Sequence, residues 1–162
     1  MFPKRRGPSM PDNISKKALG IDFGLKRIGL SLSDDTQTIA FPFKYIINES
    51  LKKTLYELKK IIDEENIVLI VIGMPIGLKG KQTEISVKIG EFIRGLKEKT
   101  GGETEIAVYD ERFSSVQAQK SLIEQNIKRK KRKEKIDSVA STFILQSYLD
   151  RQKKQQEEKT LE

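Results

Sequence analysis

Three acidic residues at well-separated points of the chain could together support metal-assisted phosphate chemistry. Asp22 lies between Gly20 and Gly24 in an alternating stretch, Glu111 follows a short apolar run, and Asp137 opens the last amphipathic segment. The chain has no cysteine and no histidine, which excludes thiol nucleophiles, Cys/His zinc sites and imidazole acid–base catalysis. Any hydrolytic reaction would therefore use carboxylates, hydroxyls, lysines or hard metal ions, which prefer carboxylate oxygens as ligands.

The stretch from Ala18 to Ser33 predicts a β-hairpin that carries Asp22 in its first strand. Apolar residues occupy every second position on both sides of a short turn, a period typical of half-buried strands. Asp22 therefore lies on the face opposite the apolar residues, where glycine neighbours leave room for a ligand. Lys26 and Arg27 in the turn are candidates for phosphate contacts. A polar residue on the solvent side of a half-exposed strand explains Asp22 equally well.

Asp137 is expected in the first turn of a last helix that starts near Ile136 and ends near Gln152. Ala140 and Ile144 follow Asp137 at spacings of three and seven, so the three residues share one helix face. The carboxylate would then point with the apolar stripe toward the sheet, which is unfavourable unless it is paired or bound to a metal. Attraction of a helix-start charge to the helix dipole is the alternative explanation.

The order of the predicted elements indicates a single α/β domain. Strands are expected over 18–33 (two), 40–47, 67–72 and 105–110, with helices over about 49–65, 85–100, 114–125 and 136–152. Three consecutive strands followed by helix–strand alternation predict a mixed five-stranded sheet, antiparallel and then parallel, with helices on both faces. Pro42 places the third strand at an edge or an irregular position. The domain is expected to span residues 18–150.

Basic residues are concentrated outside this predicted core. The formal net charge is +8, and residues 1–17, with five basic and one acidic residue, predict a flexible basic tail; 151–162 predict a charged C-terminal tail. A predicted loop over 128–135 holds seven basic residues and one acidic residue. Such a run commonly binds a nucleic-acid backbone, a solvated loop being the alternative. Its basic residues are Lys128, Arg129, Lys130, Lys131, Arg132, Lys133 and Lys135.

The sequence offers no apolar stretch long enough to span a bilayer and no apolar N-terminal signal segment. The longest apolar run covers only residues 67–72, far fewer than a membrane-spanning helix needs. We therefore expect a cytoplasmic protein with no membrane partner.

Four segments resemble a known family when they are taken in order. They read A-L-G-I-D-F-G-L-K-R-I-G, V-I-G-M-P-I-G-L-K-G, D-E-R-F-S-S and I-D-S-V-A-S-T-F-I-L-Q-S-Y-L-D, within residues 18–150. Together they resemble the YqgF family, also called RuvX, of the RNase H-like superfamily, which includes the RuvC-type Holliday junction resolvases. The resemblance implies an RNase H-like fold and a nuclease acting on the 5′ end of the 16S ribosomal RNA precursor, with junction resolution as the older assignment.

The resemblance also assigns the acids. By position, Asp22, Glu111 and Asp137 match the acidic catalytic residues of the family. The departures are mild: Phe113, Ser114 and Ser115 stand where the family usually has Leu-Thr-Thr, and Ser141 replaces the second residue of a double alanine. None of these changes removes an acid.

The expected mechanism is phosphodiester hydrolysis assisted by one or two Mg²⁺ or Mn²⁺ ions held by the three carboxylates. Asp22 would bridge the ions, while Glu111 and Asp137 would each hold one. Arg112 is a further candidate for a phosphate contact, although an arginine beside a catalytic acid can instead form a structural ion pair.

Other functions stay open at this stage. The segment D-F-G-L-K-R-I-G also resembles the first phosphate loop of actin-like and sugar-kinase ATPases, which need two such lobes, whereas 162 residues with one copy supply one. A non-catalytic RNA-binding factor of ribosome assembly is another alternative. The choice between an RNA precursor and branched DNA, and between a monomer and a weak homodimer, is also open.

Overall fold

The computed structural model describes residues 15–74, 83–110 and 132–161, with only the backbone described over 132–137. Five strands form one sheet with the order β3-β2-β1-β4-β5. The central strand β1 pairs antiparallel with β2 and parallel with β4; β3 adds antiparallel to β2, and β5 adds parallel to β4. The strands are β1 (Lys17–Phe23), β2 (Arg27–Ser33), β3 (Ala40–Ile47), β4 (Ile67–Met74) and β5 (Glu105–Asp110). The predicted mixed sheet is confirmed, with Pro42 on an edge strand.

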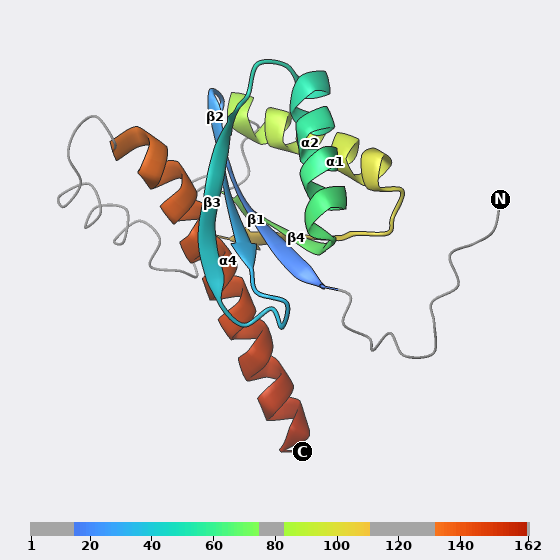
Figure 1. Ribbon diagram of the computed structural model, residues 1–162, viewed down its shortest axis with the longest axis vertical. Helices are drawn as coiled ribbons and strands as arrows, with labels where there is room; N and C mark the ends of the chain where they lie inside the picture. The colour runs from blue at the N-terminus through green and yellow to red at the C-terminus, as the bar shows by residue number, and fades with distance from the viewer. Residues whose placement is uncertain (1–14, 75–82, 111–131, 162) are drawn as a thin grey trace.

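Helices cover both faces of this sheet, as predicted. Helices α1 (Leu51–Glu65) and α2 (Glu84–Thr100) lie on one face, and α4 (Arg132–Thr160) crosses the other (Figure 1). Local signals set the ends of the first two helices. The Ser50 hydroxyl accepts a hydrogen bond from the N–H of Lys53 at the start of α1, and Gly101 ends α2 in the left-handed region at φ 61°.

Alternate residues of β1 pack into two separate hydrophobic cores, one on each face of the sheet. Leu19, Ile21 and Phe23 pack with α1 and α2, and the Phe23 ring lies 5.0 Å from the Phe92 ring of α2. Ala18 faces the other way and packs with Leu145 and its neighbours on α4. This alternation puts the even-numbered positions of β1, including 22, on the face that α4 covers.

The last helix differs from the prediction at both ends. It begins at Arg132 rather than near Ile136, so the predicted loop over 128–135 is wrong for residues 132–135; residues 128–131 lie outside the described residues. It also continues past Gln152 to Thr160, beyond the sheet (Figure 1). Residues 153–159 are lysine, glutamine and glutamate. Such residues are good helix formers, although they show no apolar periodicity. Periodicity therefore located only the part of α4 that packs on the sheet.

The turn between β2 and β3 is organised by one carboxylate. Asp34 accepts hydrogen bonds from the Thr36 hydroxyl and from the backbone N–H groups of Ile39, at 2.9 Å, and Thr38, at 2.7 Å. These hydrogen bonds, the Thr36 one foremost, lower the pKa of Asp34 from its ordinary value of 3.8 to about 2. The turn is thereby held against α4, where Gln146 donates to the Thr38 carbonyl at 2.9 Å.

Stability below about pH 4 should depend on the charge of Asp34. A carboxyl whose pKa is lower in the folded than in the unfolded chain contributes stability above the unfolded pKa, and this contribution is lost as the pH falls through the folded value, here about 2. The Tm of wild type should therefore fall more steeply between about pH 4 and 2 than the Tm of Asp34→Asn. Thermal melts followed by circular dichroism measure both profiles, and parallel profiles would contradict the assignment.

None of the helices in the described part of the chain has the length and apolar character needed to cross a membrane.

Candidate active site

A line of five residues in register crosses the sheet through Asp22. From β3 to β5 the line runs Tyr45, Gly29, Asp22, Gly73, Tyr109. Residues in register on neighbouring strands project to the same face, so Asp22 has a glycine beside it on both adjacent strands as well as two residues before and after it in its own chain. The half-buried carboxylate is thus not crowded by neighbouring side chains of the sheet.

Helix α4 lies directly on the sheet next to this line. The buried Ser31 hydroxyl on β2 lies 2.9 Å from both the carbonyl oxygen and the hydroxyl of Ser141 on α4. A Cβ at Gly20 would lie 2.8 Å from the Leu145 Cβ and 3.0 Å from the Ser141 carbonyl oxygen. Only glycine allows the helix to approach β1 this closely, two residues before Asp22.

The path of α4 brings the backbone of Asp137 to the level of Asp22. Ser141 contacts the sheet beside Gly20, and the later residue Gln146 accepts from the N–H of Ala40 at 2.8 Å, near the β2–β3 turn. The helix therefore runs antiparallel to β1. Asp137 precedes Ser141 by one helical turn, which is about 6 Å along the helix axis. This rise corresponds to about two residues along a strand, the separation of Gly20 and Asp22 on β1.

Asp137 occupies the second turn of α4, so its predicted place in the first turn is wrong. The helix begins five residues earlier, at Arg132. Ala140 and Ile144, which share its helix face, are fully buried, as the predicted apolar stripe requires. The dipole explanation for the acid is weakened, because the interaction with the helix dipole falls off beyond the first turn.

Several predicted site residues are not tested by the structure. Glu111 follows Asp110, the last residue of β5, and lies outside the described residues together with Arg112 and residues 128–131. The backbone of Arg132, Lys133 and Lys135 forms the start of α4. The path of α4 places the backbone of Asp137 level with Asp22 along the helix axis, while the meeting of the three carboxylates stays a prediction.

Lys26 lies in the β1–β2 turn, at the end of β1 that follows Asp22, whereas Arg27, predicted in the turn, is the first residue of β2. A Cβ at Gly24 would collide with the carbonyl oxygen of Arg27, so this tight turn requires glycine. Asn48 fixes the turn from outside: its side-chain amide donates to the Gly24 carbonyl at 2.9 Å, and its backbone N–H donates to the Lys26 carbonyl at 2.9 Å. Its side-chain oxygen accepts from the Thr54 hydroxyl of α1 at 3.1 Å. Sequence reasoning missed Asn48, which lies in the loop after β3.

Arg27 presents its guanidinium on the same face as Asp22. It is two residues from Gly29 on β2, and its guanidinium carbon lies 5.3 Å from the centre of the Tyr45 ring. One terminal nitrogen of this guanidinium is buried and has no hydrogen-bond partner in the part of the chain that the structure describes. An unsatisfied buried donor of this kind is unfavourable by itself and suits an anionic acceptor.

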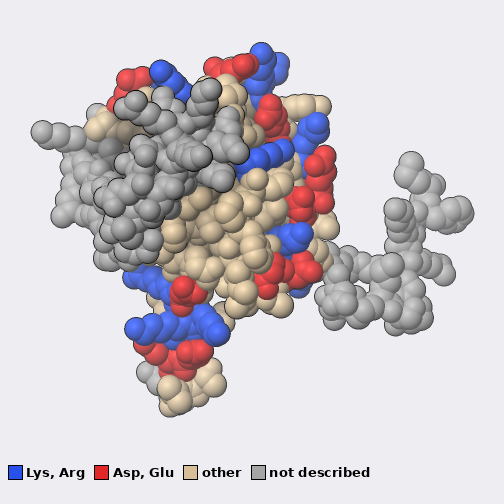
Figure 2. All heavy atoms as spheres, turned by 60° about the vertical axis from the view of Figure 1, so that its left-hand side comes forward, with Lys and Arg blue, Asp and Glu red and all other residues tan. Residues whose placement is uncertain are grey.

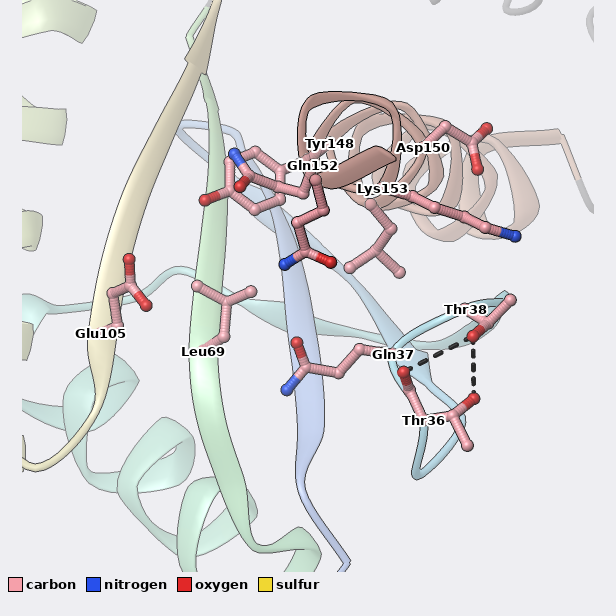
Figure 3. A pocket seen from close by; sticks show the side chains of 11 residues that line it. Thr36, Gln37, Thr38, Leu69, Glu105, Tyr148, Asp150, Gln152 and Lys153 are labelled. Carbon is pink, nitrogen blue, oxygen red and sulfur yellow. Dashed lines mark hydrogen bonds between the residues drawn. The ribbon is translucent and has the colours of Figure 1, made fainter. Parts of the chain in front are cut away.

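A cavity of about 420 Å³ opens at the opposite end of the sheet (Figure 3). Gln37 of the β2–β3 turn, Glu105 at the start of β5 and Tyr148 and Gln152 of α4 line it. Partial burial, and secondarily the charge of Glu105, raise the pKa of the Tyr148 hydroxyl. Sites in such sheets form at the carboxyl ends of the parallel strands, whereas this cavity lies at their amino ends. It is therefore separate from the Asp22 site.

The sequence comparison decides the family. Residues 16–151 match the family model described as RuvX, Holliday junction resolvase. This chain belongs to the RuvX family. A relative from Sulfurihydrogenibium sp. is 42% identical over 135 residues, which cover 83% of this chain and 90% of the relative. One from Carboxydothermus hydrogenoformans is 42% identical over 134 residues, or 83% and 96% of the two chains. Both bear the name "Putative pre-16S rRNA nuclease".

Solved structures confirm the RNase H-like fold expected for a RuvX protein. RuvC of T. thermophilus, in complex with a Holliday junction substrate, aligns with a TM-score of 0.58 at 12% identity, over 83% of this chain and 93% of RuvC. The yeast mitochondrial Holliday junction resolvase Ydc2 aligns with a TM-score of 0.51 at 13% identity, over 83% and 78%. At such identities the likeness concerns the fold.

Proposed function

We propose that this RuvX protein is a metal-dependent nuclease of the cytoplasm that processes the 5′ end of the 16S ribosomal RNA precursor. The observation that carries the proposal is the register line: a carboxylate in the middle of the sheet, with glycines on both neighbouring strands and α4 beside it. The names of relatives at 42% identity support the choice of substrate.

The residues present fit a hard divalent cation. Asp22, Glu111 and Asp137 would hold Mg²⁺ or Mn²⁺, one ion or two, with Asp22 central. Gly29 and Gly73 put no side chain in the space beside Asp22, and the chain has no histidine or cysteine to favour a softer metal. When bound, such an ion activates water and stabilises the leaving oxygen of a phosphodiester.

The chain's own basic residues would orient the substrate. Arg27, whose guanidinium is held against the Tyr45 ring, would donate to a phosphate oxygen on the face that carries Asp22. Lys26 is exposed in the adjoining turn and would contact the next phosphate. Arg112, beside Glu111 in sequence, is a further candidate for a phosphate contact.

The test compares two substrates. End-labelled 16S precursor RNA and a four-way DNA junction are incubated side by side with the protein in Mg²⁺, Mn²⁺ or EDTA. We expect metal-dependent cleavage of the RNA at its 5′ end. Cleavage of the junction alone would favour the second candidate, a resolvase, which the description of the RuvX family supports; symmetrical cutting would then call for an isologous dimer rather than a monomer. Binding without cleavage of either substrate would favour a non-catalytic assembly factor.

The basic run is expected to contribute affinity without sequence specificity. Replacing Lys128, Arg129, Lys130 and Lys131 by glutamine should weaken binding at low salt and reduce the slope of log K against log[salt] by about 0.7 for each lost contact to single-stranded RNA. Turnover at saturating substrate should stay near the wild-type value, because these side chains hold the backbone and not the reacting phosphate. Fluorescence anisotropy from about 50 to 200 mM salt measures the slope. An unchanged slope would refute this role.

A further inference from the structure

The outer strand β3 exposes apolar and aromatic side chains where the inner strands of the sheet bury theirs. Phe41 is 52% exposed, Phe43 37% and Ile47 51%. Figure 2, which brings the left-hand side of Figure 1 forward, shows a broad uncharged area on this side of the molecule, bordered by charged residues. An exposed apolar edge of this kind is a liability unless something binds there.

The strand is not built to pair with another strand. Pro42 has no N–H to donate, and the pairing register with β2 shifts between Leu30 and Ser31, opposite residues 42–44. Proline and a bulge are the features that natural sheets use to prevent edge-to-edge pairing. The exposed rings therefore call for a ligand that contacts side chains rather than the backbone.

Two aromatic rings of β3 each have the cationic group of a neighbouring side chain close to the ring. The Lys44 ammonium lies 5.1 Å from the centre of the Phe43 ring, and the Arg27 guanidinium lies 5.3 Å from the centre of the Tyr45 ring. Aromatic faces next to lysine or arginine are the combination with which proteins bind single-stranded nucleic acid: the rings stack on bases, and the cations attract the phosphates.

The Tyr45 end of this surface lies on the same face as Asp22, whereas Lys44 is in register with Leu30 and projects to the face that α1 and α2 cover. Tyr45 and Asp22 lie on the same register line, separated only by Gly29. Two strand spacings, about 9.5 Å, therefore separate their backbones, with no side chain of β2 between them on this face. A single-stranded nucleic acid with one phosphate at Asp22 could place a neighbouring base on β3.

We propose that β3 is a base-stacking platform for a single-stranded segment of the nucleic acid bound at Asp22. Tyr45 stacks on a base beside the site, and Arg27 neutralises the phosphate next to it. Phe43 stacks on a further base at the outer edge of the sheet, where Lys44 neutralises the adjoining phosphate. The platform rests on the proposed nuclease function for its substrate. It also adds to that function a preference for single-stranded over fully paired nucleic acid next to the reacting phosphate.

The test measures binding in EDTA, where no cleavage takes place. A fluorescent single-stranded RNA oligonucleotide is titrated with wild type, Phe43→Ala, Tyr45→Ala and Tyr45→Phe. Each alanine variant should bind about 5- to 100-fold more weakly, while Tyr45→Phe keeps the ring and should bind like wild type. Binding to the same sequence as a duplex should change little, because its bases are already stacked.

The matched control is Tyr56→Ala. Tyr56 is 63% exposed and also carries a cation, with the Lys60 ammonium 5.9 Å from its ring centre. It belongs to α1, on the other face of the sheet, so its loss should leave affinity unchanged. Circular dichroism confirms that each variant is folded.

Three outcomes would overturn the platform: unchanged affinity in folded alanine variants, equal losses for single-stranded and duplex RNA, or a dimer in analytical ultracentrifugation that Phe43→Ala converts to monomer. The last would make β3 an interface between two copies. Because binding is read without metal, a protein that binds through β3 yet never cleaves refutes the nuclease proposal alone. One that cleaves normally with Phe43 and Tyr45 removed refutes the platform alone.

Discussion

Asp22→Asn should reduce metal-dependent cleavage by about a thousandfold or more while the protein stays folded. Asparagine keeps the shape of the side chain and removes the negative charge that would hold a divalent cation in the middle of the sheet. Such an ion would supply several kcal/mol of transition-state stabilisation, and about 1.4 kcal/mol corresponds to a tenfold change in rate. Binding of RNA in EDTA should be equal to or slightly stronger than wild type, since a like charge near the phosphates is removed.

Single-turnover cleavage of end-labelled precursor RNA measures this effect. The control is Asp63→Asn on α1, where the carboxylate is 62% exposed and paired with Lys59 at 2.9 Å. This variant should cleave at the wild-type rate, because Asp63 lies on the helix layer opposite α4 and an exposed pair within a helix contributes little. Wild-type cleavage by Asp22→Asn would remove Asp22 from the active site and contradict the proposed carboxylate mechanism.

Gly20→Val should both destabilise the protein and reduce its activity. Any Cβ at position 20 would meet the Ser31 hydroxyl, the Leu145 Cβ and the Ser141 carbonyl oxygen at less than van der Waals separation. Forcing extra carbon atoms into a packed interface typically destabilises by about 1–3 kcal/mol, which lowers Tm by roughly 2–12 °C for a chain of this size. Because α4 carries Asp137, a displaced α4 should also lower cleavage at temperatures where the variant is still folded.

The control for this prediction is Gly90→Ala on α2. Gly90 is exposed and helical, and a Cβ there would meet nothing within 4 Å. Alanine should therefore raise stability by up to about 1 kcal/mol through helix propensity, with unchanged cleavage. Thermal melts and cleavage assays on both variants separate the two effects. A Gly20→Val protein as stable as wild type would show that α4 does not seat on β1 as described.

Local patterns in the sequence determined most of the elements of this fold. The alternation around Asp22 predicts the β1–β2 hairpin, and helical spacing of apolar residues predicts α1 and α2 within two residues of their observed starts. Gly101 marks the end of α2. These features could be predicted because each depends on residues a few positions apart, where backbone geometry alone sets which side chains share a face. The absence of histidine and cysteine limited the chemistry in the same direct way.

Only the tertiary structure decided what surrounds Asp22. The glycines beside it come from β2 and β4, and Tyr45 from β3, so their alignment depends on the pairing register of four strands. The register is set by the packing of both sheet faces and by the shift in β3, which no single segment contains. The length of α4 could likewise not be predicted from apolar periodicity, because its charged second half continues as a helix without a sheet to pack on. Contacts between distant segments form only when the whole core packs, and the candidate site is made of such contacts.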